Sequence, residues 1–203
     1  MSDVSEDLPH VVAEVPRTSY AGEIVTHLNQ DHIDRLSGVF DDIGAAQWLE
    51  KNPFGRLELT KEVLDDDGSL VNGLYDFRDA TVQVTTKRDK AEYRKTFEWQ
   101  RVYSVSSTGR TQAEAVQKTL VHELGHHIHG VLKRTDPDFY EQTRRAVLLA
   151  GGTQYAQGNF YEYFAESFAL YTYQRPALLE RDPRGHAMIE MALKRVGMEV
   201  KPQ

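Results

Sequence analysis

The spacing of apolar residues predicts helices toward both ends of the chain and strands in the middle. Ile24, Leu28 and Leu36 recur at helical intervals and predict a helix over residues 18–40, begun by a Thr or Ser cap. A short helix is expected over residues 45–51, before an Asn-Pro pair. Four further helices are expected over residues 111–129, 135–150, 159–173 and 182–196.

The helix predicted over residues 111–129 has recognisable signals at both ends. Thr111 followed by Glu114 is a capping-box pattern, which satisfies backbone amides in the first turn. Gly130 is expected to end this helix, and Pro137 fits the first turn of the next one. The segment between these signals contains no proline and is rich in good helix formers.

Residues 55–108 have the character of strands. Residues 56–60 alternate apolar and polar side chains, and residues 74–77 and 80–85 flank a turn at Arg78-Asp79. Residues 97–105 are aromatic and β-branched, and the charged stretch over residues 87–95 is expected to be a solvated hairpin loop. These strands predict a small, largely antiparallel sheet, so the fold class expected is α+β.

The chain has 203 residues, a length that suits one domain. Residues 1–17 are acidic, contain two prolines and lack periodicity, and they are expected to be a flexible arm. Residues 18–203 are expected to form a single domain. Its halves would be residues 18–108, with helix and sheet, and residues 109–203, mainly helical.

Composition narrows the class of partner. The net charge of −7 argues against nucleic acid and against an anionic membrane. Because no apolar run approaches the length of a membrane span and the start lacks a signal pattern, cytoplasmic residence is the default expectation. Export by another route, or loss of a signal by trimming, stays open. The absence of cysteine excludes disulfides, thiolate ligands and a cysteine nucleophile.

The sequence His122-Glu-Leu-Gly-His126 carries the main chemical signal. On a helix, His122 and His126 share one face, with Cβ atoms ~5–6 Å apart, so both can bind one Zn²⁺. Glu123 would project beside the metal, where it could act as general base toward a metal-activated water. The pattern is a metalloprotease motif, although a histidine pair packed in a helical core could match it by chance.

A third ligand is expected from the helix predicted over residues 159–173. Glu162 and Glu166 lie one turn apart on this otherwise aromatic segment. Glu162 suits the role of ligand, and Glu166 could accept a hydrogen bond from the free ring nitrogen of His122. Glu166 as ligand in place of Glu162 is the alternative.

These motifs resemble the metallopeptidase domain of anthrax lethal factor and its smaller relatives, the bacterial Pro-Pro endopeptidases. That family has HExxH, then a tyrosine, and seven residues later a glutamate that opens an E-[FY]-F-A-E-x-F string. This chain has HELGH from His122, Tyr155, and EYFAESF from Glu162 to Phe168. The resemblance covers roughly residues 111–173.

The resemblance implies a zincin fold of the gluzincin type. It implies one Zn²⁺ per chain held by His122, His126 and Glu162, with Glu123 as general base and Glu166 supporting a ligating histidine. It also implies that the Tyr155 phenol stabilises the oxyanion of the transition state. The activity implied is peptide-bond hydrolysis by a zinc metalloendopeptidase.

Tyr161 and His129 are two further residues with a possible place near the site. If Tyr155 is packed elsewhere, Tyr161 is the substitute phenol. His129 shares a helix side with His122 and His126, but His122 and His129 are ~10 Å apart along the axis, too far for one ion. His129 is therefore expected at the surface or close behind the ligands.

Other functions stay open at this stage. The chain could be a zinc-stabilised structural or assembly protein, or a peptidase restricted to one partner or to itself. A peptide substrate could bind as an added strand at a sheet edge, although the sequence does not say which strand forms it. The resemblance implies no preference for proline in the substrate.

Overall fold

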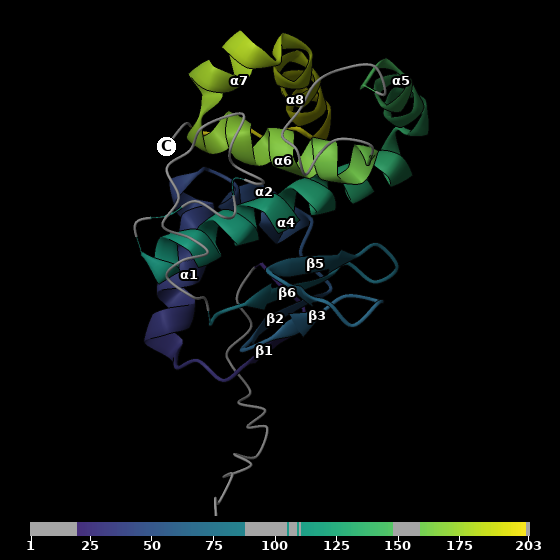
Figure 1. Cartoon of the computed structure of the whole chain (residues 1–203). Coiled ribbons are helices and arrows are strands. Elements are labelled where there is room, and N and C mark those ends of the chain that lie inside the picture. Colours follow the sequence, from purple (N-terminus) through teal and green to yellow (C-terminus); the bar gives the residue numbers. More distant parts are fainter. Residues whose placement is uncertain (1–19, 88–104, 106–108, 110, 148–158, 202–203) are drawn as a thin grey trace, which may run out of the picture.

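The computed structural model describes residues 20–87, 105, 109, 111–147 and 159–201, and the fold is mixed α+β. Figure 1 shows a small sheet beneath the long helix α4, with α6 lying on the other side of α4 and α7 and α8 above α6. The helices are α1 (Gln30–Asp42), α2 (Ala46–Lys51), α4 (Gln112–Thr135), α5 (Pro137–Val147), α6 (Phe160–Tyr173), α7 (Arg175–Arg181) and α8 (Pro183–Val196).

The main sheet has four strands in the order β1-β2-β6-β5. They are β1 (Ile24–Thr26), β2 (Arg56–Thr60), β5 (Gly73–Asp76) and β6 (Thr81–Thr85); β3 (Val63–Leu64) and β4 (Leu70–Val71) form a separate two-stranded sheet. Strands β1, β2 and β6 run parallel, and β5 pairs antiparallel with β6. Strand β5 is thus an outer strand of the sheet as described, and it is the strand that contacts α4 most.

The predicted hairpin is confirmed by β5 and β6, but the prediction of a largely antiparallel sheet is wrong for the described strands. Two of the three pairings in the main sheet are parallel. The cause is the connections, because α1 and α2 lie between β1 and β2 and carry the chain back to the same end of the sheet. The strand predicted over residues 97–105 lies outside the described residues except for Val105.

The prediction of one helix over residues 18–40 is correct only for the second part of that range. Its first part is strand β1, in which Ile24 is buried and pairs with Leu57. Helix α1 begins later, where the side chain of Asn29 accepts a hydrogen bond from the His32 amide at 3.0 Å. Apolar residues four apart fit either element, so the periodicity did not separate strand from helix.

Helix α4 begins as predicted but does not end at Gly130. The Thr111 hydroxyl accepts from the Glu114 amide at 3.1 Å, and the helix continues to Thr135. A Cβ on Gly130 would lie 3.3 Å from the Tyr75 hydroxyl and 3.5 Å from the Phe77 ring. Gly130 therefore makes room for the end of β5, and the proline that follows Asp136 stops the helix instead.

The C-terminal part follows the prediction with one addition. Helices α5, α6 and α8 lie at the expected places, and the additional helix α7 begins with Pro176 in its first turn. The core is continuous from the sheet through α4 to α6, and its largest fully buried side chains include Phe40, Phe54, Leu124 and Phe168. No helix in the described ranges is long and apolar enough to cross a lipid bilayer.

Candidate metal centre

The site forms where α4 and α6 touch. A Cβ on Gly125 would lie 2.8 Å from the Cα of Ala165, so only glycine allows the two backbones to approach this closely. This close approach sets His122 and His126 of α4 opposite Glu162 of α6.

His122, His126 and Glu162 make up a group that could hold a metal ion. Each offers one ligand atom, and these atoms lie within 4.8 Å of one another. The Nε2 of His122 is 3.2 Å from one carboxylate oxygen of Glu162, and the Nε2 of His126 is 3.5 Å from the other. Two ligands of a tetrahedral ion with bonds of ~2.1 Å are about 3.4 Å apart, so the three side chains are already near ligand spacing.

Glu166 lies behind His122. Its Oε2 is 3.3 Å from the Nδ1 of His122, and its Oε1 accepts a hydrogen bond from the Val105 amide at 2.5 Å. Its side chain is 1% exposed, so it has little freedom to turn away. This contact sets a carboxylate beside the ring nitrogen of His122 that faces away from Glu162, and a role for Glu166 in supporting a metal ligand stays a prediction.

The charges of the group are mutually compensating. Burial lowers the pKa of His122, but hydrogen bonds to Glu162 and Glu166 outweigh burial and raise its pKa well above the ordinary value. Burial likewise raises the pKa of Glu162, but hydrogen bonds to His122 and His126 outweigh it and lower that pKa. The carboxylates therefore favour a positive charge at this position, either a proton on His122 or a cation bound by the group.

Glu123 follows His122 on α4 and is buried against strand β5. A Cβ on Gly73 would lie 2.3 Å from the Oε1 of Glu123 and 2.7 Å from a methyl of Thr119. Gly73 therefore creates the space that the Glu123 carboxylate occupies. The sequence signals did not identify Gly73 or the Val105 amide, because both act through backbone placed by the fold.

His129 differs from its prediction, because it is neither at the surface nor close behind a ligand. It is 1% exposed, and its ring stacks on Phe164 with centroids 4.7 Å apart and on Tyr140 at 4.9 Å. Neither ring nitrogen has a hydrogen-bond partner among the described residues. Burial first, then the charges of His126 and Lys133, lower its pKa to about 3. His129 is a neutral member of an aromatic cluster.

His127 has a structural role between α4, β5 and the chain after α2. Its Nε2 is 2.8 Å from the Asn52 carbonyl, which only accepts, and its Nδ1 is 2.9 Å from the Tyr75 hydroxyl. The ring therefore carries its proton on Nε2 and accepts from Tyr75 at Nδ1. Burial lowers the pKa of His127 to about 4.

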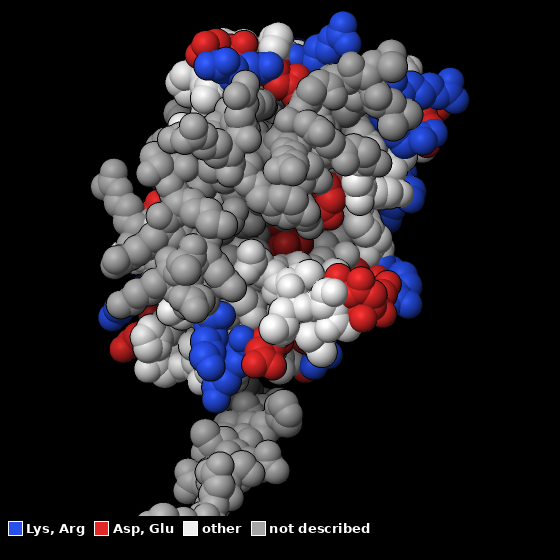
Figure 2. All heavy atoms as spheres, viewed as in Figure 1, with Lys and Arg blue, Asp and Glu red and all other residues white. Residues whose placement is uncertain are grey.

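Of the two phenols considered, Tyr155 lies outside the described residues. Tyr161 is half-buried beside the metal group, and its ring centroid is 5.0 Å from that of Phe77. The Phe77 ring in turn lies 5.9 Å from that of His126. The metal group remains reachable, since the Glu162 side chain keeps 20% of its surface exposed. Figure 2 shows a hollow on this face of the molecule, with acidic atoms deep inside it.

No model of a known protein family matches the chain, and no curated protein is significantly similar to it.

Proposed function

We propose that the protein is a zinc metalloendopeptidase with a zincin fold of the gluzincin type, related to the lethal factor peptidase domain. The observation that carries the proposal is the buried group of His122, His126 and Glu162, with Glu123 next to one ligand and Glu166 behind it. Two imidazoles and one carboxylate are a donor set used by catalytic zinc sites, which keep a further coordination position for water or substrate. We expect one Zn²⁺ per chain.

Zinc, when bound, supplies a Lewis acid that polarises the scissile carbonyl and lowers the pKa of water toward ~7. Glu123 takes the proton of the attacking water and passes it to the leaving amine. Its burial against β5 fixes the carboxylate and keeps it away from bulk solvent. Tyr155 is proposed, from the resemblance alone, to donate a hydrogen bond to the developing oxyanion.

Strand β5 is proposed as the edge on which a peptide substrate binds. Gly73, at one end of β5, lies against Glu123, so a peptide paired with this strand would pass next to the general base. Main-chain hydrogen bonds from the strand would give affinity with little dependence on side chains. The scissile bond would then lie opposite the start of β5.

Metal analysis combined with a peptide-library cleavage assay tests the proposal. Wild type, Glu123→Gln and Glu162→Ala are compared, with Glu180→Gln on the exposed face of α7 as control. Wild type and the control should bind one zinc and cleave. Glu123→Gln should keep the zinc and lose cleavage, and Glu162→Ala should lose both.

Two results would contradict the proposal. Wild-type turnover in Glu123→Gln would remove the general base from the mechanism. Zinc bound with no cleavage by any variant would favour a structural or partner-restricted role for the same site.

A further inference from the structure

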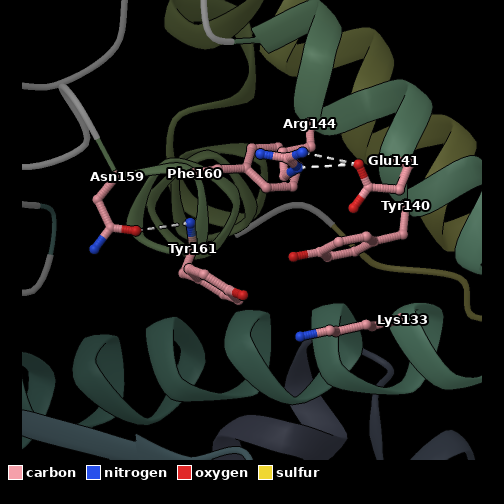
Figure 3. A pocket seen from close by; sticks show the side chains of 7 residues that line it. All are labelled: Lys133, Tyr140, Glu141, Arg144, Asn159, Phe160 and Tyr161. Carbon is pink, nitrogen blue, oxygen red and sulfur yellow. Dashed lines mark hydrogen bonds and ion pairs between the residues drawn. The ribbon is translucent and has the colours of Figure 1, made fainter.

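A second concave site lies beside the metal group, between α4, α5 and the start of α6 (Figure 3). It is a pocket of about 390 Å³ lined by Lys133, Tyr140, Glu141, Arg144, Asn159, Phe160 and Tyr161. Figure 3 shows the Lys133 ammonium and the phenol oxygens of Tyr140 and Tyr161 converging on the space between the three helices. The pocket thus combines aromatic walls with three polar groups that can donate hydrogen bonds.

The pocket carries one uncompensated positive charge. Arg144 is paired with Glu141, with contacts of 2.9 and 3.2 Å, so these two charges cancel. Lys133 has no carboxylate within ion-pair distance among the described residues, and its Nζ lies 5.6 and 5.8 Å from the ring centroids of Tyr140 and Tyr161.

The pocket is placed at a defined distance from the metal group. Lys133 is seven residues beyond His126 on α4, which is ~10 Å along the helix axis. An extended peptide covers that distance in about three residues. The Phe77 ring bridges the two sites, since it contacts the rings of both His126 and Tyr161.

The direction of β5 links the two sites. Gly73 lies against Glu123, whereas Tyr75 and Phe77 lie against Gly130, so β5 runs in the same direction as α4. A peptide paired antiparallel to β5 would therefore send its N-terminal residues toward the pocket. Antiparallel pairing is the slightly more stable choice for an added strand.

We propose that this pocket receives the side-chain carboxylate of an Asp or Glu about three residues before the scissile bond, which Lys133 binds with help from the two phenols. The inference rests on the proposed peptidase function. One uncompensated ammonium matches the single charge of a carboxylate, whereas a dianionic phosphate would keep one charge without a partner. The protein would then select peptides that carry an acidic side chain about three residues before the scissile bond.

Matched peptides test the proposal with two readouts. Fluorescent peptides from the cleaved set carry Glu or Gln at positions two to four before the cut, and both kcat/KM and Kd are measured. Wild type should prefer Glu by about tenfold at one of these positions. In Lys133→Met the ratio of kcat/KM for the Glu peptide to that for the Gln peptide should fall to about one, and Lys133→Glu should favour Lys at that position instead.

The control is Lys194→Met, which removes an exposed lysine from α8 and should keep the preference for Glu. Equal kcat/KM for Glu and Gln peptides in wild type would overturn the proposal, as would a preference for phosphoserine over Glu. If no library peptide is cleaved, the peptidase function fails. Whether the pocket binds a carboxylate is then judged from the Kd values of Glu-containing library peptides and their Gln counterparts. Glu-dependent binding lost in Lys133→Met supports it, and binding indifferent to Glu overturns it.

Discussion

At the scale of single residues, the candidate metal group is surrounded by side chains that are not themselves among its three members. Glu166 fixes the ring of His122 and is itself held by the Val105 amide. Such supporting contacts set both the ring orientation and the basicity of a ligand. The sequence alone pointed to a position for Glu166 near the group, because Glu166 is a second glutamate, one helical turn after Glu162, on an otherwise aromatic helix. The Val105 contact could not be predicted, since nearly every residue has a backbone amide and the sequence does not show which one lies beside Glu166.

Replacing Glu166 by Gln should weaken zinc binding by roughly 10- to 100-fold. The Gln carbonyl can accept from Val105 or from His122, but no negative charge remains to stabilise the histidine ligand. Competition with a chromogenic chelator measures the change. Glu190→Gln on α8 serves as control and should leave zinc affinity unchanged. Unaltered affinity in the Glu166 variant would show that this carboxylate does not support the ligand.

His129 is a second residue with a testable role. Its buried ring nitrogens lack partners in the described part of the chain, a condition that costs folding free energy. His129→Phe keeps the stacking on Phe164 and removes the polar atoms. It should raise the free energy of unfolding by about 1 to 2 kcal/mol in urea titrations with chelator present.

The same variant should change the dependence of stability on pH. The pKa of His129 is lowered to about 3 in the folded state and is ~6.5 in the unfolded state. Below pH ~6.5 His129 binds a proton in the unfolded chain but not in the folded one, so the free energy of unfolding falls as the pH drops toward 3. Lys133, His126 and the two phenols nearby face this ring. The gain from His129→Phe should be about 1 kcal/mol larger at pH 5.5 than at pH 7.5; an equal gain would contradict the assignment.

At the scale of helices and strands, prediction succeeded where local signals and tertiary packing agree. Strand β2, helix α6 and the β5–β6 hairpin follow the sequence pattern closely. It failed where packing overrides a local signal. Gly130 would normally end a helix, but the space it leaves for Tyr75 and Phe77 keeps it inside α4. Ile24 fits a helical stripe equally well, yet its pairing with β2 makes it part of a strand.

The contact between α4 and α6 should be sensitive to one methyl group. Gly125→Ala places a Cβ 2.8 Å from the Cα of Ala165. Relieving this clash requires the backbone of α4 or α6 to shift. We expect a loss of about 1 to 3 kcal/mol in unfolding free energy, and weaker zinc binding as Glu162 is pushed away. Calorimetry with and without zinc measures both effects.

Gly38→Ala in α1 is the matched control. A Cβ there meets nothing within 4 Å, so the substitution should stabilise the protein by up to about 1 kcal/mol through helix propensity. If Gly125→Ala were as mild as Gly38→Ala, the close approach of the two helices would not be required for stability.

At the scale of the whole molecule, the metal group joins parts of the chain that are far apart in sequence. His122 and His126 belong to the helix that covers the sheet, whereas Glu162 belongs to the helix that carries α7 and α8 (Figure 1). A bound ion would therefore connect the sheet side of the molecule to the C-terminal helices. The three residues of the metal group were candidates from the sequence alone, but their place between the two halves of the fold was not, because the strand order could not be derived from the sequence.

Zinc should consequently stabilise the whole fold. At a free concentration 100 times its Kd, a ligand specific for the folded state adds about 2.7 kcal/mol. Thermal unfolding followed by circular dichroism should show a zinc-dependent rise in Tm for wild type and none for Glu162→Ala. Magnesium is the control cation, since it prefers oxygen ligands and should have no effect. A wild-type Tm indifferent to zinc would argue against binding at this site.

The fixed proton of His127 gives the molecule a built-in spectroscopic probe. Its ring is locked with hydrogen on Nε2 by Asn52 on one side and Tyr75 on the other, and burial keeps it neutral at physiological pH. Its ring ¹⁵N resonances should therefore report a single tautomer with slow solvent exchange. Because the two partners come from the chain after α2 and from β5, loss of this signature would reveal separation of α4 from the sheet long before global unfolding. Watching that resonance during peptide binding would show whether the substrate strand shifts β5 or docks on it unchanged.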